Sequence, residues 1–122
     1  MFGPIDAIML KSLRQSGGAT IHPETGEAPR TGFMVSLPGA EKTLPNLSAT
    51  TGAAVRRYLK ALKALFTGHP AIYAGAWVDK HTGKVFLDAS LCVPDREAAV
   101  TLGRQFGQIA IYDVTSGSEV RL

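Results

Sequence analysis

Three histidines and a single cysteine are the side chains of this chain best suited to bind a metal or to act as a nucleophile. His22, His69 and His81 are far apart in the sequence, and none has a second His or Cys at the spacing of a zinc site. His81 lies near Asp79 at an expected hairpin tip, where turn hydrogen bonding accounts for both residue types. The sequence therefore predicts neither a metal ion nor another cofactor.

Cys92 precedes an expected helix that begins near Asp95, and a helix N-terminus can lower the pKa of a thiol. This position is one argument for a nucleophilic cysteine. Its neighbours Leu91 and Val93 are apolar, however, and no histidine adjoins it to accept a proton. The neighbours favour a buried, structural cysteine.

Aspartates occur near the ends of several expected strands, where carboxylates could hold a metal or perform acid–base chemistry. Asp95 is explained as a helix cap and Asp79 as a turn residue. Asp88 and Asp113 then remain as the pair whose place inside strands is least explained. They support one interpretation of the chain, a small-molecule sponge or minor enzyme.

No catalytic motif accompanies these residues. The chain contains no Walker A motif, no Gly-x-Gly-x-x-Gly after a strand and no Gly-x-Ser-x-Gly elbow. The sequence thus favours a non-catalytic protein and identifies no catalytic, cofactor-binding or metal-binding residue.

Basic residues gather on one side of the expected helix at about 49–67. Arg56, Lys60 and Lys63 follow a spacing of four and then three residues, and Arg57 lies beside them. Such a stripe could contact an acidic protein surface or phosphates, although a solvated helix face is the commoner explanation. No aromatic residue interleaves the stripe to stack on bases. We expect these four residues to be partner-binding.

The amino-acid composition limits which classes of protein this chain can belong to. The 122 residues suit a single domain, 1–122, and 45% hydrophobic with 19% charged residues is ordinary globular composition. No apolar run approaches the roughly 20 residues of a membrane span, and the N-terminus lacks the pattern of a secretory signal. We expect a cytoplasmic protein without a membrane partner. The net charge of +3 tolerates an acidic partner without requiring one.

The first half of the chain predicts two helices and two strands. Ile5, Ile8, Met9 and Leu13 have helical spacing before Gly17. The segments 19–21 and 32–37 have the composition of strands, which we expect to form a long hairpin, and 38–46 is expected to be a mobile loop. A helix capped by Ser48 or Thr50 should then continue to about residue 66, with Tyr58 on its apolar side.

The second half predicts a hairpin, a helix and a final strand. Thr82-Gly83 supplies the tight turn between strands at 71–79 and 84–90. A helix should begin at Asp95 and end at Gly107, before a strand at 109–114. The expected fold is α+β, in the order α-β-β-α-β-β-α-β, with one mixed or mainly antiparallel sheet centred on the 71–90 hairpin. Its helices should lie chiefly on one face.

The C-terminal segments GAWVD (75–79), TGKVFLDAS (82–90), DREA (95–98) and GQIAIYD (107–113) carry a resemblance. Together they resemble small uncharacterised proteins of phages and conjugative elements, and modules of the large polyvalent proteins of such elements. The resemblance extends loosely to TGFMVS (31–36). It implies a bacterial host, and positions that define the module at Trp77, Asp88, Asp95, Arg96 and Asp113.

The resemblance implies an accessory binding protein that engages and inhibits a host protein or ribonucleoprotein complex, for example a CRISPR effector. The alternative is nucleic-acid binding through Arg56, Arg57, Lys60 and Lys63, which would weaken steeply with salt. The third interpretation is the small-molecule one. Exposed strand edges would also allow a homodimer by sheet extension.

Overall fold

The computed structural model describes residues 5–122. Along these residues, helices and strands follow one another in the order α1 (Ile5–Ser16), β1 (Gly18–Ile21), β2 (Phe33–Ser36), β3 (Lys42–Leu44), α2 (Gly52–Ala61), α3 (Lys63–Thr67), β4 (Ile72–Val78), β5 (Val85–Val93), α4 (Arg96–Gln105), β6 (Ala110–Asp113) and β7 (Ser118–Arg121). The predicted α+β class is confirmed.

All strand pairs of the sheet are antiparallel, in the order β1-β4-β5-β2-β6-β7. The hairpin of β4 and β5 lies at its centre, as predicted, with Ile72 opposite Leu91 and Val78 opposite Val85. The nine residues of β5 are long enough to pair with two strands along their other edge. β3 takes the first part of that edge and β2 the last.

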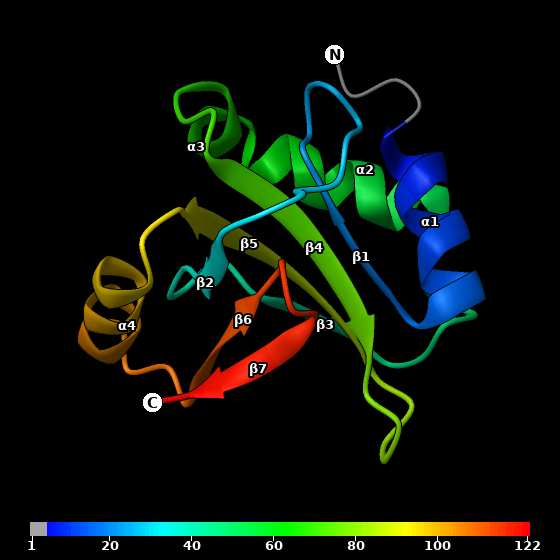
Figure 1. Ribbon diagram of the computed structural model, residues 1–122. Helices are drawn as coiled ribbons and strands as arrows, with labels where there is room; N and C mark the ends of the chain where they lie inside the picture. The colour runs from blue at the N-terminus through cyan, green and yellow to red at the C-terminus, as the bar shows by residue number, and fades with distance from the viewer. Residues whose placement is uncertain (1–4) are drawn as a thin grey trace.

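The helices of residues 5–122 pack on one face of this sheet, which confirms the prediction. Alternate side chains of the central hairpin form the main core with α1, α2 and α3: Ile72, Ala74, Ala76, Val85, Leu87 and Ala89. Val35 of β2 lies opposite Leu91 of β5, so both point to this side. Val35 forms a second cluster with Ile111 and with Ala99 of α4. Figure 1 shows α1 and α2 near β1 and β4, and α4 at the other end of the sheet.

The predicted hairpin of residues 19–21 and 32–37 is wrong. β1 pairs with β4, whereas β2 pairs with β5 and β6. Gly17, at φ 81°, turns the chain from α1 directly into β1. The apolar face of α1 then covers β1 and β4, which leaves β1 on the edge away from β2. A long connection between the strands permits this because its entropic cost grows slowly with length.

The segment 38–46 is more ordered than predicted, since it contains β3 and a buried anchor. Thr43 lies opposite Phe86 of β5, and the Tyr58 hydroxyl donates a 2.6 Å hydrogen bond to the carbonyl of Ala40. Tyr58 is buried, as predicted. Ile8 was predicted to lie on the apolar face of α1, but its side chain is exposed. Leu10 is buried in its place.

The expected helix at about 49–66 is divided. Thr51 is its N-cap, in place of Ser48 or Thr50, and accepts a hydrogen bond from the amide of Ala54. Leu62, at φ −105° and ψ 17°, separates α2 from α3, and Phe66 of α3 lies in the main core. Asp95 caps α4 as predicted.

Candidate binding groove

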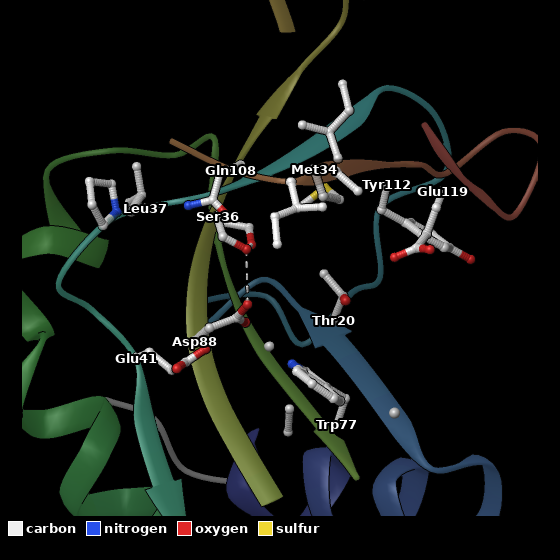
Figure 2. Close-up of a pocket in the computed structure, with 18 of the residues that line it drawn as sticks. Thr20, Met34, Ser36, Leu37, Glu41, Trp77, Asp88, Gln108, Tyr112 and Glu119 are labelled. Atoms are coloured by element: carbon white, nitrogen blue, oxygen red, sulfur yellow. Dashed lines mark hydrogen bonds between the residues drawn. The ribbon is translucent and has the colours of Figure 1, made fainter. Parts of the chain in front are cut away.

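The sheet face opposite the helices is hollowed into an open groove of about 1020 Å³ (Figure 2). Its floor comes from β1, β4, β5 and β2. The loop at 37–41, which leads from β2 toward β3, forms one rim, and the hairpin of β6 and β7 forms another. The main core lies beneath this floor, so the groove is separate from it.

Two glycines, Gly18 and Gly75, lie in the floor of the groove. Gly75 of β4 lies between Thr20 of β1 and Asp88 of β5. A Cβ atom at Gly75 would overlap the Oδ1 atom of Asp88, so the absence of a side chain is what lets this carboxylate lie across β4. Gly18 of β1, which also has no side chain, lies opposite Trp77.

Trp77 and Phe86 form an aromatic stack on the same face. Their ring centroids are 4.5 Å apart and their planes differ by 18°. Although Phe86 covers one face of the indole, Trp77 remains 43% exposed. The other face of the indole is turned toward β1, where Gly18 has no side chain. An aromatic surface is therefore available to a ligand.

Asp88 is the most deeply placed charge of the groove. Its Oδ2 atom accepts a 3.2 Å hydrogen bond from the hydroxyl of Ser36, while Oδ1 forms none within residues 5–122. Burial raises the pKa of the Asp88 carboxyl, the hydrogen bond from Ser36 opposes this rise, and the negative charge of Glu41 adds to it. Burial, followed by the charges of Asp88 and Glu41, also raises the pKa of Tyr58 well above its usual value.

Acidic side chains outnumber basic ones along the groove. Glu41, Asp88 and Glu119 line it against a single arginine, Arg121. The groove therefore has an excess of negative charge in a chain whose net charge is +3. Such a surface favours a cationic group over an anionic one.

The rim of β6 and β7 adds apolar contact area. Tyr112 is 44% exposed there, and it lies opposite Met34 of β2 on the groove side of the sheet. Ile109, which precedes β6, is 73% exposed. The groove thus has the carboxylate of Asp88 near the indole of Trp77 in one part, and the carboxylate of Glu119 beside Tyr112 and Met34 in another.

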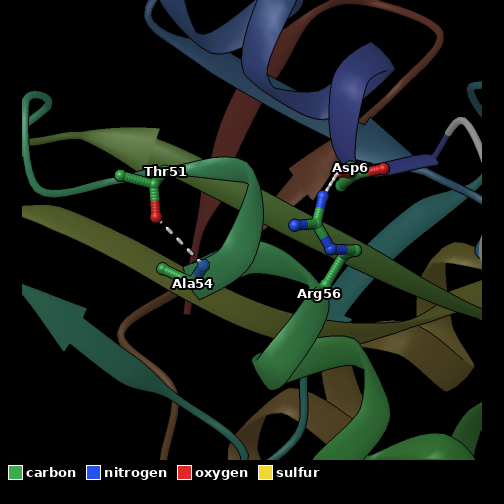
Figure 3. Close-up of polar contacts among 4 residues, drawn as sticks. All are labelled: Asp6, Thr51, Ala54 and Arg56. Atoms are coloured by element: carbon green, nitrogen blue, oxygen red, sulfur yellow. Dashed lines mark hydrogen bonds and ion pairs between the residues drawn. The ribbon is translucent and has the colours of Figure 1, made fainter.

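The basic residues predicted to bind a partner lie on the opposite side of the sheet. Arg56, Arg57, Lys60 and Lys63 are all exposed. Arg56 is engaged in a 2.6 Å ion pair with the nearly buried Asp6 of α1 (Figure 3). Among residues 5–122 the other three form no ion pair. Their role as a partner surface stays a prediction.

The two aspartates that the sequence left unexplained are not brought together. Asp88 faces the groove, whereas Asp113 lies two residues after the buried Ile111, on the same face of β6, and so faces the helix side. Asp113 accepts hydrogen bonds from the amides of Thr115 and Ser116 in the turn before β7. The arrangement gives no support to chemistry by this carboxylate pair.

The structure gives no support to a chemical role for Asp79 or Cys92. Asp79 accepts hydrogen bonds from the amide of His81 and the hydroxyl of Thr82, and these bonds lower the pKa of its carboxyl. Burial raises the pKa of the Cys92 thiol, the opposite of what a nucleophile near a helix N-terminus requires. Among the described residues no three His, Cys, Asp or Glu side chains gather in a way that could hold a metal ion.

The aromatic lining of the groove was not predicted as a site, although the sequence contains its signal. Alternation along 72–78 and 85–93 places Trp77, Phe86 and Asp88 on the side away from the apolar core positions. With helices on one face only, that side had to remain open.

Comparison with models of protein families, with curated proteins and with solved structures yields no match for this chain. Within residues 5–122, no helix has the length and apolar character to cross a membrane.

Proposed function

We propose that this chain is a non-catalytic binding protein that engages another protein through the groove on the open face of its sheet. The observation that carries this proposal is the exposure of Trp77 and Tyr112 along a groove that no other element of residues 5–122 covers. Large aromatic side chains are enriched at the centres of protein interfaces, where they contribute most of the binding energy.

The class of partner follows from the resemblance of the segments 75–79, 82–90, 95–98 and 107–113 to proteins of phages and conjugative elements. We propose a protein or ribonucleoprotein complex of a bacterial host, inhibited by occupation of its surface, with a defence complex such as a CRISPR effector as the leading example.

Nucleic-acid binding is the second candidate because Arg57, Lys60 and Lys63 are exposed and free of ion pairs among residues 5–122. The groove itself does not favour this partner, since its excess of carboxylates would repel phosphates.

The test is an affinity pulldown of tagged protein from bacterial lysate, with and without nuclease, read by mass spectrometry. Two variants accompany the natural chain: Trp77→Ala with Tyr112→Ala in the groove, and Arg57→Glu with Lys60→Glu and Lys63→Glu on the helices. Circular dichroism establishes that both variants fold.

We expect the natural chain to recover a defined protein even after nuclease treatment. The groove variant should no longer recover this protein, whereas the helix variant should still recover it. Recovery that disappears with nuclease and with the helix variant, but not with the groove variant, would establish nucleic-acid binding instead. A protein partner that the groove variant recovers as well as the natural chain does would contradict the proposal.

A further inference from the structure

A slot in the floor of the groove is bordered by an indole and a carboxylate. Gly18 of β1 lies opposite Trp77, and Gly75 lies opposite Asp88. The Oδ1 atom of Asp88 thus lies over Gly75, whereas the open face of the indole has no side chain beside it at Gly18. Trp77 follows Gly75 by two residues, so Trp77 and Asp88 are diagonal neighbours on one face, separated by the distance that a long side chain can span.

The unused binding capacity of these two groups indicates a cation. Trp77 offers the aromatic ring that attracts cations most strongly. The Oδ1 atom of Asp88 has no hydrogen-bond donor within residues 5–122, and the described residues contain no buried side-chain oxygen or nitrogen that lacks a partner. Oδ1 is therefore accessible from the groove, and Glu41 adds negative charge beside it.

A guanidinium group suits this slot better than an ammonium group. It is planar, so it can stack on the free face of the indole, and its N–H groups lie in that plane, directed toward a carboxylate at the edge. An ammonium group is compact and more strongly hydrated, and it cannot stack.

The size of the groove indicates that the cation belongs to a longer chain. Its volume of about 1020 Å³ reaches the upper end of the range for small-molecule pockets, and it is open along one side. Beyond the slot it continues to Met34 and Tyr112, which a single arginine would leave uncovered. An extended segment can place an arginine in the slot and apolar side chains against this far end.

We infer that the groove binds an extended protein segment that presents an arginine, with its guanidinium stacked on Trp77 and paired with Asp88. This inference rests on the proposed function and adds the chemistry of the partner. The apolar neighbours of that arginine contact Met34 and Tyr112, and the carboxylate of Glu41 strengthens the attraction for the cation.

Intrinsic fluorescence tests the inference directly, because Trp77 is the only tryptophan of the chain. The probes are acetylated, amidated pentapeptide mixtures with randomised flanking positions and a fixed central arginine, lysine or citrulline. Free arginine amide serves as the small-molecule probe. We expect the arginine mixture to change the emission of Trp77 and to bind roughly tenfold more tightly than the citrulline mixture, since citrulline retains the shape but lacks the charge.

Two variants of matched charge identify the site. Asp88→Asn keeps the shape of the side chain and should weaken binding of the arginine mixture by about tenfold. Glu24→Gln removes one negative charge from an exposed position outside the groove and should leave binding unchanged. Equal binding of arginine and citrulline mixtures, of arginine and lysine mixtures, or of both variants would overturn the inference. Free arginine amide that binds as tightly as the peptides would overturn the assignment to a protein segment.

The pulldown separates a failure of this inference from a failure of the proposed function. A protein partner that is lost with Trp77→Ala and Tyr112→Ala, but is retained in full by Asp88→Asn, would uphold the binding function and reject the arginine. A partner retained by both variants would reject both proposals.

Discussion

Asp88 is the residue at which folding and binding oppose each other most clearly. Its carboxylate lies across Gly75, mostly buried, with one hydrogen bond from Ser36. Because burial raises its pKa, the folded protein binds a proton at Asp88 more tightly than the unfolded chain does. The stabilisation that this proton provides is present in full below the pKa of the unfolded chain and is lost as pH rises through the folded pKa. Above the pKa of the unfolded chain, Asp88 therefore reduces the stability of the free protein.

We therefore expect Asp88→Asn to unfold at a higher temperature than the natural chain at pH 7. The difference should shrink as the pH falls and vanish below about pH 4, the ordinary pKa of an aspartate, because the natural carboxyl is then neutral as well. Thermal unfolding followed by circular dichroism between pH 3 and pH 8 measures this. A variant less stable than the natural chain at pH 7 would show that the carboxylate is well solvated or paired.

At the scale of elements, two contacts between segments fix the helix layer and one rim of the groove. The Tyr58 hydroxyl of α2 holds the carbonyl of Ala40, in the loop that carries Glu41 to the groove. Arg56, on the same helix, reaches Asp6 of α1. α2 thus links the neighbouring helix to a rim on the other side of the sheet.

Tyr58→Phe should reduce the free energy of unfolding by about 1–2 kcal/mol, because it leaves the carbonyl of Ala40 without its donor. Urea unfolding measures the change. The control is Tyr112→Phe, whose exposed hydroxyl has no hydrogen bond within residues 5–122 and whose loss should change stability by less than about 0.5 kcal/mol. Equal effects of the two variants would mean that the loop is not anchored through Tyr58.

Arg56→Met should reduce the free energy of unfolding by about 1–2 kcal/mol. The reason is that the nearly buried carboxylate of Asp6 then loses its only ion-pair partner among residues 5–122. Arg57→Met is the matched control, with the same change on the neighbouring exposed residue and an expected effect within about 0.5 kcal/mol. Chemical denaturation compares them. The ion pair contributes little if the two variants are alike.

For the whole molecule, the two hydrophobic clusters differ in size. The main cluster under β1, β4 and β5 contains most of the buried apolar residues, whereas the cluster of α4 consists of Val35, Ala99 and Ile111 with partly buried neighbours. The hairpin of β6 and β7 belongs to the smaller cluster, and one of its strands, β7, is a sheet edge. This hairpin also carries Tyr112 and Glu119 to the groove.

Amide hydrogen exchange should therefore find the β6–β7 hairpin about tenfold less protected than the β4–β5 hairpin, since fewer buried contacts must break to open it. Equal protection of both hairpins would show that the molecule opens as one cooperative unit. A ligand in the groove should slow exchange in β6 and β7 more than in α1, because the hairpin touches the groove and α1 packs on the other face.

The sequence by itself determined the elements whose cause is local. Thr82-Gly83 and the alternation on either side of it predicted the central hairpin, and Asp95 with Gly107 bounded α4, because turn geometry and helix capping depend on near neighbours in the chain. The α+β class and the helices on one face followed from these elements and their apolar sides.

Only the tertiary structure decided which distant segments meet. Which surfaces must be buried together decides that β1 pairs with β4 and that the 38–46 segment forms strand β3. It also decides the break between α2 and α3 at Leu62. The same holds for part of the groove: the hairpin of β4 and β5 already places Gly75 beside Asp88, but Gly18 reaches Trp77 from β1, far away in the sequence. The position of Gly18 opposite Trp77 arises from the register of β1 on β4, which no local pattern specifies without the partner strand.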